Sequence, residues 1–237
     1  MNAILAIAKK ELLSSFNSPL AYLFMTVFLL LTSWLFFQDY FLLGQADMRP
    51  FFELIPWMLL FLIPAITMRS FAEEKKLGTS ELLLTMPLRE YEIVLGKFFS
   101  ALLFFLVTLI MSFMIPILVL WTGPADLGVI LASYLGSFFL GASYIALGIY
   151  LSSFTDNQII AFILTLVISF LFLMIGQLFV IQTIPNFLAP VFQFLGLASH
   201  FTSISRGVID SRDILYYLSF IGFFLFLNTF SLSRRSS

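Results

Sequence analysis

Long apolar runs dominate the chain, and the charged residues are concentrated between them. No Asp, Glu, Lys or Arg occurs within residues 12–38, 98–125, 127–155 or 214–233. A charge at the centre of a bilayer helix costs roughly 2.5–3.5 kcal/mol on insertion scales, and one crossing needs about 20 residues. Each of these stretches therefore predicts one membrane-spanning helix. The charge-free stretch 157–205 is too long for one crossing and too short for three.

The complete pattern predicts six spans. They lie at residues 19–38, 51–71, 98–121, 127–151, 158–180 and 214–232. The second span is irregular because it contains Glu53 and is interrupted by Pro56 and Pro64. Proline is tolerated in membrane helices when neighbouring groups satisfy the freed backbone carbonyls. The sequence therefore predicts an all-α, polytopic membrane protein.

The distribution of basic residues supports the second span independently. With six crossings and a cytoplasmic N-terminus, the cytoplasmic side receives Lys9, Lys10, Arg69, Lys75, Lys76, Arg89, Lys97, Arg234 and Arg235. The outside receives only Arg49, Arg206 and Arg212. Without the second span, the basic stretch 69–97 would lie outside, against the tendency of Lys and Arg to stay in the cytoplasm. We therefore expect a multi-pass protein of the inner (cytoplasmic) membrane with both termini in the cytoplasm.

Composition narrows the classes of function. Hydrophobic residues make up 61% of the 237 residues and charged residues 11%, against about 25% charged residues in soluble domains. This balance argues against a soluble enzyme and against a disordered chain. The formal net charge of −1 argues against a nucleic-acid partner held by bulk electrostatics. The chain has no cysteine, which excludes disulfides and thiolate metal sites.

Residues 3–16 are predicted to form an amphipathic helix on the cytoplasmic surface of the membrane. The basic pair follows the first apolar run instead of preceding it, so the segment does not resemble a cleaved signal peptide. The alternative is a helical extension of the first span, but Asn17-Ser18-Pro19 is a strong helix breaker. The residues assigned to this interfacial helix are Leu5, Lys9, Lys10, Leu12 and Phe16.

Residues 181–213 are too apolar for water and too broken to cross a bilayer. They contain Pro185, Pro190 and Gly196, and we expect short helices that re-enter the outer leaflet. Non-helical backbone at that depth must be buried in protein or face a water-lined cavity. The single histidine, His200, is expected to make a structural polar contact in this re-entrant segment, which also contains Arg206.

Small residues recur every four positions in the fourth span, at Ser133, Ser137 and Gly141. This spacing lets helices approach closely. Two interpretations fit the spacing: packing against another span of the same chain, or an interface with a second subunit.

Catalytic machinery is missing from the sequence. One histidine cannot supply a His-pair zinc site or the HExxH pattern. Gly96-Lys97 is preceded by Tyr91, where a phosphate-binding loop needs Gly, and followed by Phe98, where it needs Ser or Thr. We therefore predict no catalytic, cofactor-binding or metal-binding residue in this chain, and no enzyme activity of its own.

The one dense polar region lies between the second and third spans, at residues 72–92. Gly78 is expected to break the helix that leaves the membrane, and Thr79 to cap a new helix with Glu81 in its first turn. Pro87 disfavours helical geometry at the residue before it and so ends this helix. Its exposed apolar side would carry Leu82, Leu83 and Met86. Such a helix docks in a groove on a cytoplasmic partner or rests on the bilayer or neighbouring loops, and the physics leaves both open.

The same region carries a resemblance to a known family. The string Glu73-Glu74-Lys75, Gly78-Thr79, Glu81-Leu82-Leu83-Leu84-Thr85 and Pro87, closed by Glu92-Ile93-Val94-Leu95-Gly96-Lys97, resembles the loop of ABC-2 type transporter permeases. The resemblance extends over almost the whole chain. Ser18-Pro19, Pro56-Trp57 and the runs 64–69 and 203–210 resemble the gliding-motility-associated (GldF-like) subgroup.

The resemblance implies a single ABC-2 type transmembrane domain over residues 1–237 and an exporter-type complex. The loop would hold the coupling helix, which contacts a separate cytoplasmic ATPase subunit that binds ATP and Mg. A second permease subunit, identical or different, completes the membrane pathway, and an auxiliary extracytoplasmic subunit is compatible with the pattern. The implied coupling residues are Glu73, Glu74, Lys75, Gly78, Thr79, Glu81, Leu82, Leu83, Met86 and Pro87.

Two further expectations follow from this family assignment. A second, shorter cytoplasmic contact is expected at Thr155-Asp156-Asn157, for which an ordinary tight turn is an equally good interpretation. The alternative function is a non-transporting membrane scaffold of an envelope or motility machine. A scaffold would share the topology but needs no ATPase, and the segment from Gly78 to Pro87 speaks against it.

Overall fold

The computed structural model describes residues 3–43, 47–79, 88–183, 185 and 187–236. These residues form helices and turns and contain no strand. The helices are α1 (Ala3–Phe16), α2 (Pro19–Leu43), α3 (Arg49–Thr67), α4 (Ala72–Lys76), α6 (Glu90–Ser112), α7 (Met114–Thr122), α8 (Leu127–Ser152), α9 (Gln158–Ile175), α10 (Leu178–Ile181), α11 (Ala189–Leu195), α12 (Leu197–Ser205) and α13 (Ser211–Ser236).

Six segments among the described residues are long and apolar enough to cross a membrane: Pro19–Gln38, Arg49–Lys76, Glu90–Thr122, Leu127–Ser152, Gln158–Ile175 and Ser211–Arg234. The prediction of an all-α polytopic membrane protein is thereby confirmed.

Helix α8 is the centre of the bundle and packs on α3, α6, α9, α12 and α13. Small residues allow these close approaches. A Cβ atom at Gly141 would lie 2.2 Å from the ring of Phe105 on α6, and one at Gly148 would lie 2.3 Å from the hydroxyl of Thr67 at the end of α3. Ser133 donates a hydrogen bond to the carbonyl of Ser205. Of the predicted small-residue stripe, Ser133 and Gly141 therefore contact other helices of the same chain.

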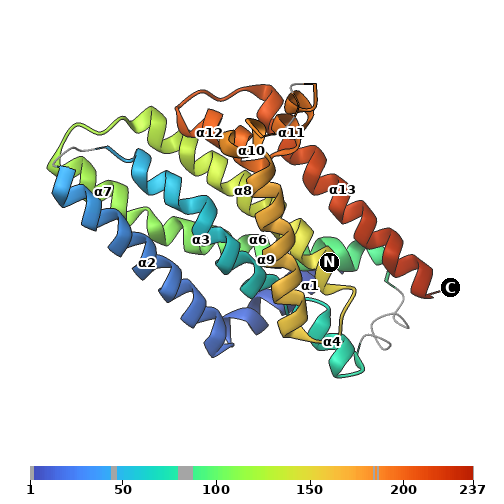
Figure 1. Cartoon of the computed structure of the whole chain (residues 1–237). Helices are drawn as coiled ribbons and strands as arrows, with labels where there is room; N and C mark the ends of the chain where they lie inside the picture. The colour runs from blue at the N-terminus through green and yellow to red at the C-terminus, as the bar shows by residue number, and fades with distance from the viewer. Residues whose placement is uncertain (1–2, 44–46, 80–87, 184, 186, 237) are drawn as a thin grey trace.

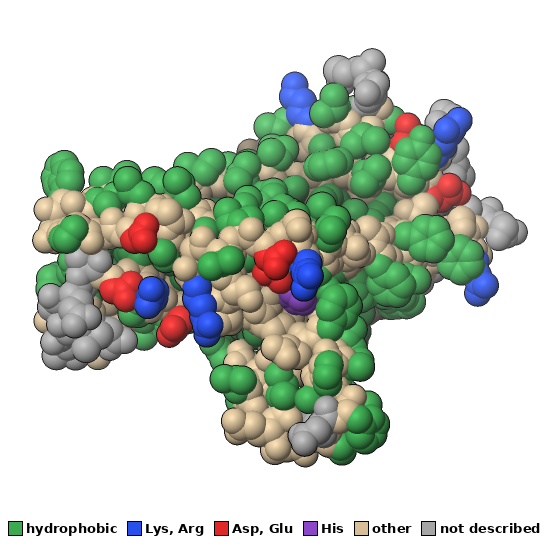
Figure 2. All heavy atoms as spheres, turned by 90° about the horizontal axis from the view of Figure 1, so that it is seen from above, with side chains coloured by type: hydrophobic (Ala, Val, Ile, Leu, Met, Phe, Trp, Pro, Cys, Tyr) green, Lys and Arg blue, Asp and Glu red, His purple; other side chains and the backbone are tan. Residues whose placement is uncertain are grey.

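The outer helices of the bundle present apolar side chains to their surroundings. Helix α2 exposes Trp34, α9 exposes Ile163 and α13 exposes Phe226, among many others. Figure 2, viewed from above the molecule, shows charged side chains only in small groups among apolar ones. Such a surface would aggregate in water, whereas lipid tails are as apolar as these side chains.

The third span begins earlier than predicted and contains a break that was not predicted. The sequence placed the span at 98–121, but α6 begins at Glu90 because the carboxylate of Glu92 accepts a hydrogen bond from the backbone N–H of Arg89. The helix is interrupted at Phe113, between α6 and α7. Pro116 explains this break, because its ring clashes with the carbonyl group four residues earlier, at Ser112.

The predicted helix at 158–180 is also too long. Helix α9 ends at Ile175, and the short α10 follows after Gly176. Gly176 and Gly196 touch backbone to backbone: a Cβ atom at Gly196 would lie 2.2 Å from the Cα atom of Gly176. Helix α3 likewise ends at Thr67 instead of residue 71, while α13 extends beyond its predicted limits of 214–232 at both ends.

The bundle has two distinct ends. Helices α10, α11 and α12 gather at the top in Figure 1, and α4 lies at the bottom with the turn that joins α8 to α9. Helix α12 buries Leu197, Phe201 and Ile204 against α8 and its neighbours. The described part of the segment 181–213 contains the short helices α11 and α12, which pack on one end of the bundle, and its placement in the outer leaflet stays a prediction.

The backbone contact between the two glycines gives a stability prediction. Gly196→Ala should destabilise the protein by about 2 kcal/mol, the usual cost of overpacking, because the new methyl group meets backbone that cannot rotate away. Gly222→Ala on α13 is the matched control, since nothing lies within 4 Å of a Cβ atom there. Thermal unfolding of the purified protein in detergent measures both. Equal melting temperatures for the two variants would contradict the contact.

Candidate functional site

The end of the bundle that carries α4 is organised around Lys97 of α6. The Lys97 side chain is only 2% exposed, and its ammonium group lies 2.7 Å from Glu74 Oε1 of α4 and 3.7 Å from Glu11 Oε1 of α1. It also donates a hydrogen bond of 2.6 Å to the carbonyl of Ser70 and sits 4.9 Å from the ring centre of Phe71. One buried cation therefore joins α1, α4 and α6.

Local packing explains why these partners converge. Ile7 of α1 lies directly over Gly96 of α6, where a Cβ atom would be 2.7 Å from the Ile7 side chain. The absence of a side chain at Gly96 lets α1 approach α6 and brings Glu11 to Lys97. A buried ammonium group is costly unless it is paired and hydrogen-bonded. Two carboxylates, a carbonyl group and an aromatic face together supply this compensation.

A second set of contacts ties α4 to the end of α8. The hydroxyl of Ser152 accepts hydrogen bonds of 3.1 Å from the N–H groups of Phe71 and Ala72 and donates one of 3.2 Å to the carbonyl of Met68. The ammonium group of Lys75 donates to the carbonyl of Ser153. These bonds replace the helical hydrogen bonds lost between α3 and α4, which accounts for the end of α3 at Thr67.

The predicted second contact, Thr155-Asp156-Asn157, begins two residues after Ser153 and therefore lies at the same end as α4. Asn157 caps α9 by accepting a 2.9 Å hydrogen bond from the N–H of Ile159, and its own N–H donates to the hydroxyl of Thr155. Asp156 is exposed. The segment thus has the geometry of a capped turn, and its contact with a partner stays a prediction.

The structure divides the predicted coupling residues into groups. Glu74 and Lys75 contact their own chain, Glu73 is partly exposed, and the hydroxyl of Thr79 donates to the carbonyl of Glu74. Gly78 has a φ of +70°, a conformation that favours glycine. The remaining predicted residues lie outside the described part of the chain: Glu81, Leu82, Leu83, Met86 and Pro87.

Helix α1 is separate from the first span, because the helix ends at Phe16 and α2 begins at Pro19. Its placement on the membrane surface stays a prediction. The structure adds that α1 packs mainly on α6, with the Phe16 ring 5.2 Å from that of Phe104. Of the other residues assigned to the interfacial helix, Leu12 is half-buried and the exposed ones are Leu5, Lys9 and Lys10.

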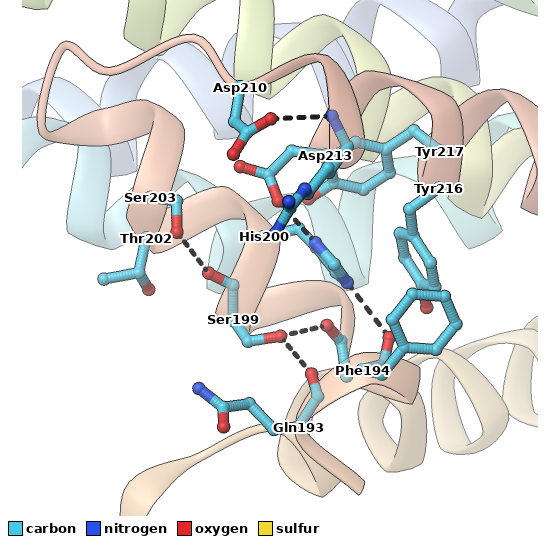
Figure 3. Close-up of polar contacts among 12 residues, drawn as sticks. Gln193, Phe194, Ser199, His200, Thr202, Ser203, Asp210, Asp213, Tyr216 and Tyr217 are labelled. Atoms are coloured by element: carbon cyan, nitrogen blue, oxygen red, sulfur yellow. Dashed lines mark hydrogen bonds and ion pairs between the residues drawn. The ribbon is translucent and has the colours of Figure 1, made fainter. Parts of the chain in front are cut away.

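At the opposite end, His200 of α12 is clamped against α13 (Figure 3). Its Nδ1 lies 2.6 Å from Asp213 Oδ1, its Nε2 lies 3.0 Å from the carbonyl oxygen of Phe194, and its ring stacks on Tyr216 at 4.0 Å. The hydroxyl of Tyr216 donates to the carbonyl of Leu195. These contacts fasten α11 and α12 to α13. Three predicted residues of the segment are exposed: Pro185, Pro190 and Arg206.

Sequence reasoning missed Lys97 and Ser152 as organising residues. Lys97 was used as a cytoplasmic charge, in the test for a phosphate-binding loop and in the string that resembles the family loop, but it was assigned no structural contact, and Ser152 was not singled out. The described residues contain no group of three or more His, Cys, Asp or Glu side chains that could hold a metal ion. The contacts of Lys97 and Ser152 make the α4 end a junction between helices.

The comparisons with known proteins assign a family. The family model described as ABC-2 family transporter protein matches residues 44–227, which is most of the chain. The chain therefore belongs to the ABC-2 transporter family. A search of curated proteins finds no match.

The Lys97 junction gives a second stability prediction. Lys97→Met should cost about 3 kcal/mol, since removing the cation leaves the partly buried carboxylates of Glu11 and Glu74 without their partner. Lys76→Met is the matched control, because Lys76 is exposed on α4. Melting temperatures in detergent should fall clearly for the first variant and stay near the wild-type value for the second. A wild-type melting temperature for Lys97→Met would show that the junction contributes nothing to the fold.

Proposed function

We propose, from membership of the ABC-2 transporter family, that this chain is the permease subunit of an exporter-type ATP-binding cassette complex. A separate cytoplasmic ATPase subunit would bind ATP and Mg and dock at the α4 end. Two permease subunits, identical or different, would form the pathway across the inner membrane. The chain itself would hydrolyse nothing. Family membership supports the role of membrane component, and the junction at the α4 end supports the docking position.

The observation that carries the proposal is the rigid attachment of α4 to the bundle. Helix α4 is followed by Leu77, Gly78 and Thr79, and the chain then enters residues 80–87, which lie outside the described part. Helix α4 is joined to α6 and α1 through Lys97 and to α8 through Ser152. A force applied to the loop after α4 would therefore act on at least three helices at once. This is what a coupling element requires.

The same geometry suggests how ATP-driven movement would reach the membrane. Helix α8 is the central helix of the bundle, and α6 packs on both α1 and α8. Displacement of α4 would tilt α3 and α6, the second and third spans, against α8. Small shifts in a close-packed core are transmitted instead of absorbed. The short helices α10–α12, which cover the other end of the bundle, would then face the outer leaflet and act as a lid over the pathway.

The scaffold alternative needs the same six spans but no junction between the loop and the core. No observation on the described residues favours it. The buried cation under α4 is expensive for a passive loop, since a well-packed apolar residue would stabilise the junction as well or better. A loop that must return to one geometry after each movement has a use for directional, charge-assisted hydrogen bonds.

Gly78 offers a direct test of coupling. Gly78→Val should abolish permease-dependent ATP hydrolysis, because a β-branched residue at a φ of +70° is strongly disfavoured and would redirect the chain that enters residues 80–87. Leu77→Val is the matched control, since the φ of Leu77 is −87°. ATPase activity and partner recovery are measured on complexes purified in mild detergent.

The double variant Leu82→Ala with Leu83→Ala tests the docking surface predicted from the sequence. Burying a leucine side chain contributes about 1.5–3 kcal/mol, so the pair should carry most of a small contact. Full partner binding and coupled hydrolysis in both this variant and Gly78→Val would refute the coupling role.

Orientation is tested separately, using the absence of native cysteine. Lys76→Cys at the α4 end and Pro124→Cys in the turn before α8 both place a thiol on an exposed residue. A membrane-impermeant maleimide should label Pro124→Cys in intact cells and label Lys76→Cys only after permeabilisation. The reverse result would invert the topology and remove the proposed docking position.

A further inference from the structure

The C-terminal end of α11 is held by side chains from the helices next to it (Figure 3). The last carbonyl groups of a helix have no partner within the helix and need one outside it. His200 Nε2 of α12 lies 3.0 Å from the carbonyl oxygen of Phe194. The hydroxyl of Tyr216 on α13 donates a 2.6 Å hydrogen bond to the carbonyl of Leu195. The position of α11 therefore depends on what these side chains can donate.

The His200 ring lies between two groups that accept hydrogen bonds. Its Nδ1 is 2.6 Å from Asp213 Oδ1, and its Nε2 faces the carbonyl of Phe194. A neutral imidazole has one N–H group, whereas an imidazolium has two. Both contacts with an ionised carboxylate and a carbonyl are therefore hydrogen bonds only when the ring is protonated and positively charged.

The faces of the ring also suit a cation. Tyr216 stacks on the His200 ring with the two ring centres 4.0 Å apart, and an aromatic face attracts a cation at this distance. The carbonyl end of α11 carries a partial negative charge. The charged form of His200 is therefore favoured by one carboxylate, one helix end and one aromatic face.

The elements packed against α12 carry few other titratable groups. Helices α9 and α11 have none in their sequences, and α8 meets α12 through Ser133 and Gly136. From α13, Tyr217 lies edge-on to the His200 ring at 6.2 Å. The charged side chains of α3 and the other charged side chains of residues 197–213 are exposed: Arg49, Glu53, Arg206, Asp210 and Arg212. Asp213 is the charged partner of the ring.

Loss of the proton breaks one of the two bonds, and the geometry determines which. A neutral ring with its hydrogen on Nε2 would turn a lone pair towards the full negative charge of Asp213. A hydrogen on Nδ1 instead turns the lone pair towards the partial charge of the Phe194 carbonyl, which is the smaller repulsion. The neutral ring therefore stays bonded to α13 and releases the end of α11.

Helix α11 forms one wall of an apolar cavity of about 490 Å³, whose other walls are α9 and α13. Phe194 and Leu195 line it from α11, opposite Phe172 of α9 and Phe220 of α13. The carbonyl that the neutral ring releases thus belongs to a residue of the cavity wall. Movement of α11 changes the width of this cavity.

We propose that His200 is a protonation switch that controls the attachment of α11. The charged ring joins α11 to α13 and fixes the cavity wall, and the neutral ring loosens it. Histidine changes charge between about pH 5 and pH 8, so α11 is fixed in the acidic part of this range and loosened in the alkaline part. The hydroxyl donors Ser199 and Tyr216 keep their hydrogens throughout, so α11 stays partly attached. The switch is independent of the ATPase-coupling role.

The single histidine of the chain makes the ring directly observable. Full-length protein labelled with ¹⁵N-histidine and purified in detergent without a histidine tag shows only this ring by NMR. Both ring nitrogens should carry a hydrogen at about pH 5.5, and Nε2 alone should lose its hydrogen as the pH is raised to about 8. A neutral ring with its hydrogen on Nε2 would overturn the proposal.

A spin label measures the movement of α11. Gln193→Cys places the only thiol of the chain on an exposed position, and the hydrogen bond from Ser199 to the Gln193 carbonyl does not use the replaced side chain. The paramagnetic resonance spectrum of this label should show higher mobility at about pH 8 than at about pH 5.5. Pro124→Cys, in the turn before α8, is the matched control and should not change. Equal mobility of the Gln193→Cys label at both pH values contradicts the switch.

Variants in the Gln193→Cys background assign the response to the ring. His200→Gln should remove the pH dependence, since a glutamine does not titrate. Asp213→Asn should move the change in mobility to lower pH by about one unit, because an opposite charge favours the charged ring. Asp210→Asn is its matched control, since the Asp210 carboxylate accepts from the backbone N–H of Arg212, and should leave the change nearly in place.

A pH dependence that survives His200→Gln would assign the movement to another group and overturn the proposal. An equal displacement in Asp213→Asn and Asp210→Asn would contradict the pairing of His200 with Asp213. If Asp213→Asn fails to fold, the NMR titration and the His200→Gln variant decide.

Discussion

The compensation of one buried ammonium group determines the architecture of the α4 end. Lys97 is almost fully enclosed, and no single helix can supply its partners. Helix α1 must lie on α6 to provide Glu11, and the chain after α3 must turn back to provide Ser70 and Glu74. Removal of any one of these contributions weakens the compensation of a charge that would cost several kcal/mol if it were buried alone. Segments that are distant in sequence are therefore required to form this junction together.

The spans were predictable because their determinant is local. A charge within the hydrocarbon core is penalised wherever it occurs, so charge-free stretches reveal the helices directly, and all six appear in the structure. Pro116 could have predicted the break at Phe113, because its effect on the carbonyl of Ser112 is also local. The end of α9 could not be predicted in this way. It depends on Gly176 meeting Gly196, twenty residues away, and no local pattern encodes that encounter.

The candidate site shows the same division. The positive φ of Gly78 agrees with its predicted role as a helix breaker, since the need for glycine is a property of one residue. The roles of Lys97 and Ser152 depend on long-range contacts. The hydroxyl of Ser152 accepts hydrogen bonds from N–H groups that lie some 80 positions earlier in the chain. Nor does the sequence distinguish Glu73 from Glu74, although only Glu74 reaches the buried cation. Residue type predicted a polar loop, and tertiary packing decided which of its charges are structural.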